Sequence, residues 1–172
     1  MTRCGTLALA TAALFALAGT ARAQHASLAV GAAAPIGDFS SSAGTGLDVE
    51  LQARTEPLIG PLSLRLDIGY DFFRGKDVNA STTVSAQSVG VVGDISSKFY
   101  WVAGPGYFES TVKTQISGHP VSEQRTYFGA QAGVGVNIPV FRWEGFLEVS
   151  GVKLFTPGPG IVYVPVRFGI RL

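Results

Sequence analysis

The chain of 172 residues contains one cysteine, Cys4, which lies close to its start. Beyond that position the sequence offers no disulfide and no thiol for metal binding or catalysis. Charged residues make up 15% of the sequence, below the roughly 25% of soluble domains. No basic excess or sequence motif for nucleic-acid binding is present. No apolar run reaches the roughly 18 to 20 residues of a membrane-spanning helix.

The first 23 residues have the three parts of a secretory signal peptide. Arg3 gives a basic start, residues 7–18 form a short apolar run, and Ala21-Arg22-Ala23 forms an A-x-A end. A membrane anchor is the alternative, but the apolar run is too short to span a bilayer. We therefore predict a signal peptide at 1–23 and one domain at 24–172. Loss of Arg3 and Arg22 changes the net charge from +1 to −1.

Glycine and alternating hydropathy dominate the rest of the chain. In LSLRLDIGYDF, residues 62–72, every even position is apolar and every odd position is polar or glycine. Successive side chains of a strand point to opposite faces, so this segment predicts a strand with one apolar face. Its length matches the roughly 9 to 11 tilted residues that cross a bilayer. The same pattern, with weaker members, predicts eight strands at 25–35, 46–54, 62–72, about 83–95, 99–111, 126–138, 144–155 and 161–172.

Two of these strands are less regular. The faces of 99–111 stay unassigned because residues 99–102 are all apolar, and the lost alternation at Val91 and Val92 is interpreted as a bulge. The connections alternate in length. Those at 57–61, 96–98 and 139–142 are short, those at 37–45, 74–80 and 114–123 are longer, and 156–160 is a compact Pro-Gly turn. Short turns at one end and longer loops at the other are typical of outer-membrane barrels.

Alternation alone also fits a soluble β-sandwich or lipocalin. Three features favour a membrane barrel, in which the apolar face points to lipid and the charged face points inward. The polar faces are rich in glycine and serine, aromatic residues gather near strand ends, and lysine is scarce and lies mostly in turns, loops or near strand ends. Aromatic girdles mark the two interfaces of a bilayer, and an arginine at the lipid midplane costs about 2 to 4 kcal/mol. The sequence therefore predicts an all-β fold, an eight-stranded antiparallel up-and-down transmembrane β-barrel.

The predicted lumen is nearly balanced in charge. Its acidic residues are Asp48, Glu50, Asp67, Asp71, Asp94, Glu144 and Glu148, and its basic residues are Arg54, Arg65, Arg142, Arg167 and Arg171. Eight strands leave room only for side chains, so these charges should pair across the barrel. We predict that Glu148 pairs with one or more of Arg65, Arg167 and Arg171. The predicted charge network comprises Glu50, Arg65, Asp67, Glu148, Arg167 and Arg171, and it favours a plug over an open pore.

Catalytic signals are weak. The two histidines are His25, at the start of the first strand, and His119, in a polar loop near Ser122 and Glu123. A nucleophile beside a base suggests hydrolysis, but a polar loop contains such residues by composition alone. No metal-ligand spacing or phosphate-binding glycine motif is present. We predict no enzyme activity and no cofactor.

The later strands carry a resemblance to a known family. The residues concerned are Phe128-Gly129, Gly133-Val-Gly135-Val-Asn-Ile-Pro139, Phe146-Leu-Glu148-Val and Val164-Pro-Val166-Arg-Phe168-Gly169-Ile170-Arg-Leu172. They resemble the small outer-membrane β-barrel proteins of Gram-negative bacteria, of the OmpA/OmpX-like type. The resemblance covers essentially all of 24–172 and concerns architecture, not one activity.

This resemblance implies several expectations. In that family the last strand is similar to an assembly signal read by the barrel-assembly machinery; here it would comprise Phe168, Ile170 and Leu172, with leucine where the family usually ends in phenylalanine. We expect a monomer in the outer-membrane lipid, both ends periplasmic, with a structural or interaction role for the outer loops and an unknown extracellular ligand. Alternatives are a small porin, a lipid-modifying enzyme and a secreted soluble barrel that carries a ligand.

Overall fold

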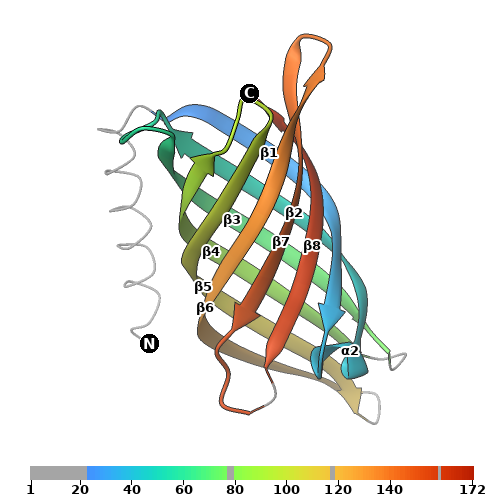
Figure 1. Ribbon diagram of the computed structural model, residues 1–172. Helices are drawn as coiled ribbons and strands as arrows, with labels where there is room; N and C mark the ends of the chain where they lie inside the picture. Colours follow the sequence, from blue (N-terminus) through green and yellow to red (C-terminus); the bar gives the residue numbers. More distant parts are fainter. Residues whose placement is uncertain (1–22, 77–79, 117–118, 159) are drawn as a thin grey trace.

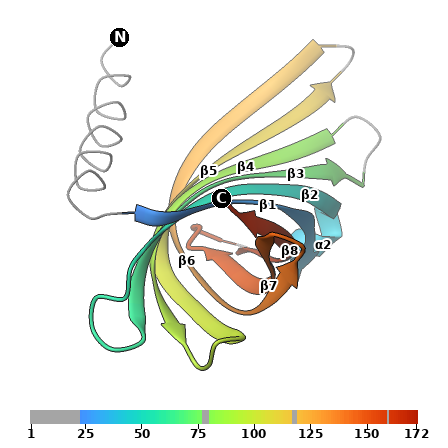
Figure 2. The ribbon, with the colours of Figure 1, turned by 90° about the horizontal axis from the view of Figure 1, so that it is seen from above.

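The fold is a single closed sheet of eight antiparallel strands. The structure is a computed structural model, which describes residues 23–76, 80–116, 119–158 and 160–172. The strands are β1 (Ala23–Ile36), β2 (Ala43–Thr55), β3 (Leu62–Gly75), β4 (Ala80–Asp94), β5 (Phe99–Ile116), β6 (His119–Val140), β7 (Trp143–Leu154) and β8 (Ile161–Arg171). Each strand pairs with the next along the chain, and β8 pairs with β1 to close the barrel (Figures 1 and 2). The eight-stranded antiparallel barrel predicted from the sequence is confirmed.

The first and last strands meet along most of their length. Leu28 lies opposite Ile170, and the Leu172 backbone N–H donates to the Ala26 carbonyl at 2.7 Å. Closure of this kind leaves no sheet edge within the barrel wall, which an apolar environment requires because an unpaired backbone group there has no water to bond. The predicted signal peptide at 1–23 lies outside the described residues except for Ala23, the first residue of β1.

Several predicted boundaries are wrong. The loop predicted at 37–45 contains a one-turn helix, α2 (Phe39–Ser42), and β2 already begins at Ala43. The loop predicted at 114–123 is mostly strand, because β5 and β6 remain paired as far as Ile116 and His119. Polar residues show no hydropathy alternation, so the sequence could not reveal this pairing. No described helix is long and apolar enough to cross a membrane.

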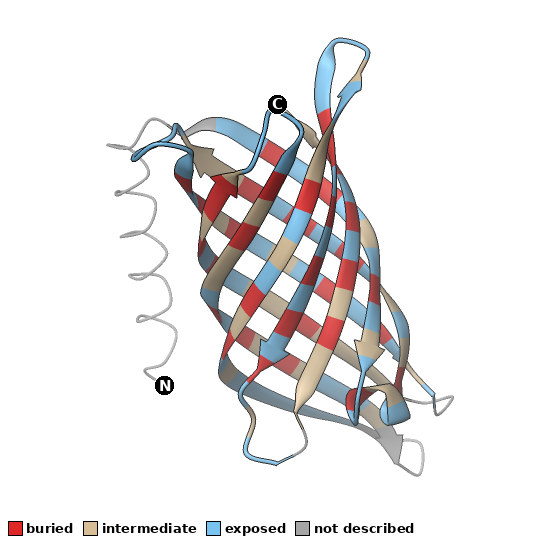
Figure 3. Cartoon of the chain, in the orientation of Figure 1, coloured by how far each residue is buried: buried red, intermediate tan, exposed pale blue. Residues whose placement is uncertain are grey.

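The side chains alternate between the two faces of the wall, as the pattern of buried and exposed positions shows (Figure 3). On β3, Leu64 and Ile68 are 43% and 39% exposed, whereas Arg65 and Asp67 are 3% and 1% exposed. The apolar face is thus outside and the charged face inside, as predicted. The strand β5 also follows the rule, with Tyr100, Val102 and Phe108 buried inside. No register shift occurs at Val91 and Val92 in the β4 ladders, so the predicted bulge is wrong.

Candidate functional site: the lumen

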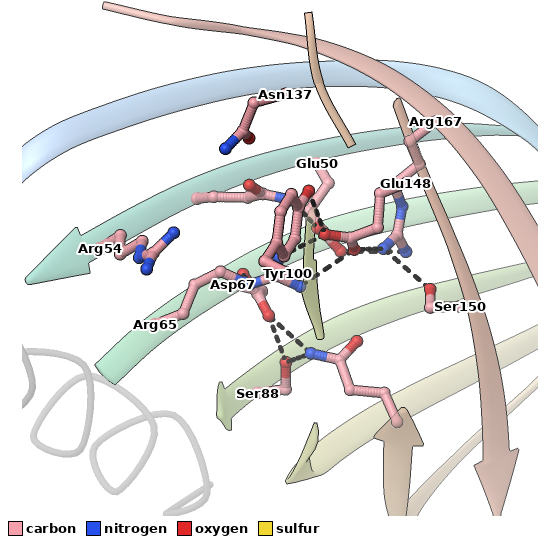
Figure 4. Close-up of polar contacts among 12 residues, drawn as sticks. Glu50, Arg54, Arg65, Asp67, Ser88, Tyr100, Asn137, Glu148, Ser150 and Arg167 are labelled. Atoms are coloured by element: carbon pink, nitrogen blue, oxygen red, sulfur yellow. Dashed lines mark hydrogen bonds and ion pairs between the residues drawn. The ribbon is translucent and has the colours of Figure 1, made fainter. Parts of the chain in front are cut away.

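The centre of the lumen is organised around the buried carboxylate of Glu148 on β7. Arg65 on β3 donates from Nη1 to Oε2 at 2.5 Å and from Nη2 to Oε1 at 3.1 Å. The Tyr100 hydroxyl on β5 donates to Oε2 at 2.9 Å, and Arg167 Nη1 on β8 donates to Oε1 at 3.4 Å. Figure 4 shows these side chains converging from separate strands. A bidentate arginine holds the plane of the carboxylate in one orientation and also stabilises its negative charge.

Arg167 is the second centre of this cluster. Its Nε and Nη2 donate to the two oxygens of Asp48 at 2.8 and 3.1 Å. Nη2 also lies 3.0 Å from Glu50 Oε2, and Nη1 donates to Ser150 Oγ at 3.3 Å. Arg167 therefore links carboxylates from β2 with Glu148 on β7.

A third group of contacts crosses from β3 to β6. Gln131 Nε2 donates to Asp67 Oδ2 at 2.6 Å and to Ser88 Oγ at 2.7 Å, and the Ser88 hydroxyl also donates to Asp67 Oδ2. Arg65 Nε forms an ion pair with Asp67 Oδ1 at 2.8 Å. Together the three groups join seven of the eight strands through side chains inside the barrel, so they brace its cross-section.

Glycines make room for the aromatic side chains of the lumen. A Cβ added to Gly135 would lie 2.2 Å from the Tyr100 ring, and one added to Gly169 would lie 2.2 Å from the Phe146 ring. Each ring thus lies over a glycine of another strand. The glycine-rich inner face expected for a narrow barrel has this direct cause, because a larger residue would displace the ring.

The buried part of the lumen is strongly acidic. Five carboxylates are buried there, namely Asp48, Glu50, Asp67, Asp71 and Glu148, but only Arg65 and Arg167 are buried with them. The predicted near balance of charge is therefore wrong. Asp71 Oδ2 accepts from the Tyr163 hydroxyl at 2.7 Å, whereas Asp71 Oδ1 has no hydrogen-bond partner among the described residues.

The remaining predicted lumen charges lie at or outside the rim near the two chain ends. Arg54 donates to Asp94 at 2.6 Å, and Arg171 donates to Glu144 at 3.2 Å and to Asn137 at 2.7 Å. Arg171 was predicted to belong to the buried network, and it does not. Glu144 and Arg142 are exposed, so their assignment to the lumen is also wrong.

A polar cup of about 480 Å³ opens at this same rim. Its lining includes His25, Arg54, Glu56, Asp94 and Arg171. We call this end of the barrel the termini end and the opposite end the loop end. The network around Glu148 and Arg167 lies deeper in the lumen, beyond the rim pairs, and its side chains are buried.

A cluster of buried apolar residues, which we call the aromatic cap, lies in the lumen at the loop end. Phe39 from α2 packs edge-on against Phe73, with ring centroids 5.0 Å apart, and Phe73 packs edge-on against Tyr163 at 5.2 Å. Val84, Phe108 and other buried residues complete the cluster. Tyr163 also bonds Asp71, so the cap is connected to the acidic region. The lumen thus has a polar and an apolar layer in series.

Neither histidine belongs to a catalytic arrangement in the described part of the chain. His119 lies at the tip of the β5–β6 hairpin, and Glu123 forms its ion pair with Arg125. His25 lines the cup. Among the described residues no group of three His, Cys, Asp or Glu side chains could hold a metal ion.

Comparison with solved structures gives clear matches to the fold. A crystal structure of Ail, the attachment invasion locus protein of Yersinia pestis, matches with a TM-score of 0.64 and 14% identity over 86% of this chain and 98% of Ail. Ail in complex with the heparin analogue sucrose octasulfate matches with a TM-score of 0.59, 16% identity and the same coverage. Neisserial surface protein A matches with a TM-score of 0.56 and 11% identity over 86% of this chain and 95% of that one. The fold is that of an eight-stranded outer-membrane β-barrel. No protein-family model and no curated protein matches the sequence.

Sequence reasoning missed several residues of the lumen. The side chains of Tyr100, Ser88, Gln131 and Tyr163 donate to buried carboxylates, and the Ser150 hydroxyl accepts from Arg167. One usable signal was present on β5, because Gly104 and Gly106 lie at even positions like Tyr100. Since glycine marks the inward face of a narrow barrel, the even positions of that strand could have been assigned to the lumen.

Proposed function

We propose that this protein is an integral barrel of the bacterial outer membrane, OmpA/OmpX-like in type, whose projecting loop-end sheet binds an extracellular partner. It has no catalytic role, and its lumen is a plug. The support for the membrane location is the outward apolar face together with aromatic residues near both ends, such as Phe72, Tyr107 and Phe128 at the loop end and Phe99 and Trp143 at the termini end.

The observation that carries the binding role is a free strand edge on β6. β5 pairs with one edge of β6 from His119 to Val136, but the β7 ladder on the other edge begins only at Gly129 opposite Leu154. No described strand pairs with the other edge between His119 and Tyr127. Residues 121–126 are all exposed there. A free edge is a template for an added strand, and peptide recognition by strand addition uses it.

The direction of the backbone groups on this edge follows from one bond. The Phe155 N–H donates to the Phe128 carbonyl at 2.9 Å, from the β7 side. In an antiparallel strand the groups of every second residue point to the same side, so Ser122, Gln124 and Thr126 offer their N–H and C=O groups to the free edge. The side chains of Glu123 and Arg125 point to the opposite face of β6 from those of Ser122, Gln124 and Thr126, and they form an ion pair there. The hydrogen bond that Arg125 donates to the Glu123 carboxylate raises the pKa of Arg125 above its ordinary value.

A proline substitution tests this edge without breaking the barrel ladder. In Gln124→Pro the lost N–H is one that points to the free edge, and proline is tolerated at such edge positions. The matched control is Gln124→Ala, which removes the side chain but keeps the N–H. The probe is a phage library of extended ten-residue peptides selected on the purified barrel in detergent.

We expect enriched peptides that bind the wild type and Gln124→Ala equally and lose binding to Gln124→Pro. Enriched peptides that bind all three proteins equally would contradict strand addition, as would a selection that enriches none. Recovery in the outer-membrane fraction with heat-modifiable gel mobility tests the membrane location, and recovery of soluble protein in the periplasm would contradict it.

A sulfated or phosphorylated glycan is a second candidate ligand. Arg74, Ser81 and Lys113 lie side by side in register across β3, β4 and β5, with Ser122 next on β6. Arg74 and Lys113 are exposed on the outer face, just beyond the aromatic residues of the loop end. Ail was crystallised with a heparin analogue. Calorimetry with sucrose octasulfate should give binding to the wild type and loss of it in Arg74→Gln/Lys113→Gln; equal binding by both proteins would contradict this candidate.

A further inference from the structure

The β6–β7 hairpin ends in a tip, residues 140–143, that stands above the other turns of the termini end (Figure 1). Val140 pairs with Trp143, so the turn itself consists of Phe141 and Arg142. Phe141 is fully exposed, Trp143 is 53% exposed and Arg142 is exposed. The tip therefore presents two aromatic rings on either side of one cation.

The backbone at Phe141 is strained. Its φ is +52°, the one positive φ of a non-glycine residue in the described part of the chain. The first central residue of a tight hairpin turn with positive φ is normally glycine, asparagine or aspartate, because a bulky side chain is disfavoured there. A fully exposed phenylalanine in this conformation gains nothing from packing inside the protein, and strain of this kind is associated with functional sites.

The tip continues the lipid-facing surface of the barrel. Even positions of β6 and odd positions of β7 point outward, so Ile138 and Trp143 extend the apolar column formed by Val134 and Leu147. The nearest acidic residue in the sequence, Glu144, is exposed at the rim on the side of β7 away from Trp143, where Arg171 bonds it. Arg142 is thus free of a carboxylate partner among the described residues, and its surroundings on the outer side are apolar.

Similar exposed apolar residues occur at every described turn of this end. Leu58 and Ile59 lie in the β2–β3 turn and Ile95 in the β4–β5 turn, and all three are more than half exposed. These turns are distributed around the circumference of the barrel, with no large patch on one side. An occupant that surrounds the barrel, as a lipid leaflet does, fits this distribution better than a compact protein partner.

We propose that the hairpin tip binds the headgroup of a membrane phospholipid. Arg142 contacts the phosphate diester, while Phe141 and Trp143 enter the boundary between headgroups and acyl chains, where aromatic side chains prefer to lie. Arginine suits this contact because its planar guanidinium matches two phosphate oxygens. The tip would then fix the depth of the termini end in its leaflet. This inference rests on the proposed location of the barrel in a membrane.

The experiment uses the two tryptophans of the chain. In a Trp101→Phe background Trp143 is the sole tryptophan, and the barrel is inserted into phosphatidylcholine vesicles with and without phosphatidylglycerol. Lipids brominated at different depths then report the position of Trp143 by quenching. Native mass spectrometry counts the phosphatidylglycerol molecules that remain bound to the wild type, Arg142→Gln, Phe141→Gly and the control Arg125→Gln, which changes an exposed arginine at the loop end.

We expect Trp143 to be quenched most by bromine near the headgroups and to be protected from aqueous iodide. We also expect Arg142→Gln and Phe141→Gly to retain severalfold less phosphatidylglycerol than the wild type and Arg125→Gln. Phe141→Gly relieves the positive φ, so it should not destabilise the barrel, and its lipid loss cannot be attributed to misfolding. If the barrel inserts but iodide quenches Trp143 and brominated lipids do not, the tip stands in water and the inference is wrong. Failure of the wild type to insert at all would instead refute the proposed membrane location.

Discussion

Arg65 and Glu148 are 83 positions apart in the sequence, and the two guanidinium Nη atoms of Arg65 bond both carboxylate oxygens of Glu148 across the middle of the barrel. Neither side chain is more than 3% exposed. The pair joins β3 to β7, which are not neighbours in the sheet. It therefore ties opposite parts of the wall together, a role that the strand ladders cannot fill.

Breaking this pair should destabilise the barrel strongly. In Glu148→Gln, the buried Arg65 loses its bidentate carboxylate and keeps only the ion pair with Asp67. Loss of one member of a buried pair typically costs about 3 to 5 kcal/mol. Urea unfolding in detergent micelles, followed by tryptophan fluorescence, measures the free energy of unfolding. The control is Glu144→Gln, which breaks the exposed pair with Arg171 and should cost less than about 1 kcal/mol. Equal losses for the two variants would contradict a structural role of the central pair.

Asp71→Asn, unlike Glu148→Gln, should not lower the free energy of unfolding of the barrel. Five carboxylates share the buried lumen with two arginines, and an uncompensated buried charge is very unfavourable. The amide of asparagine can still accept from Tyr163, and the substitution removes one surplus negative charge. We expect the free energy of unfolding to stay within about 1 kcal/mol of the wild type or to rise. A loss as large as that of Glu148→Gln would mean that the acidic surplus does not destabilise the lumen.

The register of the hairpins explains which pairs the sequence could have revealed. Glu148 lies opposite Arg167 in the β7–β8 ladder, and the same register places Glu144 opposite Arg171. Arg171 therefore lies near the rim, four residues further along β8 than the residue that faces Glu148. Hairpin register and the alternation of LSLRLDIGYDF could be read from the sequence, as could the inward direction of the charges.

Contacts across the lumen could not be read in this way. Whether Arg65 meets Glu148 depends on the tilt and stagger of the closed barrel, which no local pattern specifies. The polar end of the β5–β6 hairpin has no apolar face, so its strands gave no signal. On β5 the inward residues Tyr100, Val102 and Phe108 are themselves apolar, which concealed the difference between the faces.

Gly135→Ala should destabilise the lumen because the new methyl group would collide with the Tyr100 ring, which lies 2.2 Å from the position of the added Cβ. Displacement of the ring also weakens the bond from the Tyr100 hydroxyl to Glu148. Overpacking of this kind typically costs about 1 to 3 kcal/mol. Gly151→Ala is the control, because its added Cβ has no neighbour closer than 3.9 Å. Urea unfolding compares them, and an equally stable Gly135→Ala would show that the ring can move without loss.

The wild-type protein should not conduct ions steadily in a planar lipid bilayer. If the charge network and the aromatic cap each close the lumen, as we propose, removal of one layer leaves the second in place. Phe39→Ala opens part of the cap but leaves Phe73, Tyr163 and the whole charge network, and it should also remain closed. Combining Phe39→Ala with Arg65→Ala and Glu148→Ala should give measurable conductance. A large, steady conductance of the wild type would refute the plug and favour a small porin.

The last strand should affect assembly through its final residue. Phe168 and Ile170 lie on the outward face of β8, and Leu172 follows directly after the strand. Leu172 takes the place where an aromatic residue is expected from the family resemblance. If these residues form the signal for the barrel-assembly machinery, Leu172→Phe should assemble faster than the wild type, and Leu172→Asn should assemble more slowly. A pulse-chase in cells, in which the heat-modifiable folded fraction is followed with time, measures the rate.

Leu147→Phe is the control, since it adds the same ring to the outward face of β7 away from the chain end. Acceleration by Leu147→Phe as well would point to a general gain in apolar surface, and an unchanged rate for Leu172→Phe would show that the terminal position is not part of the signal.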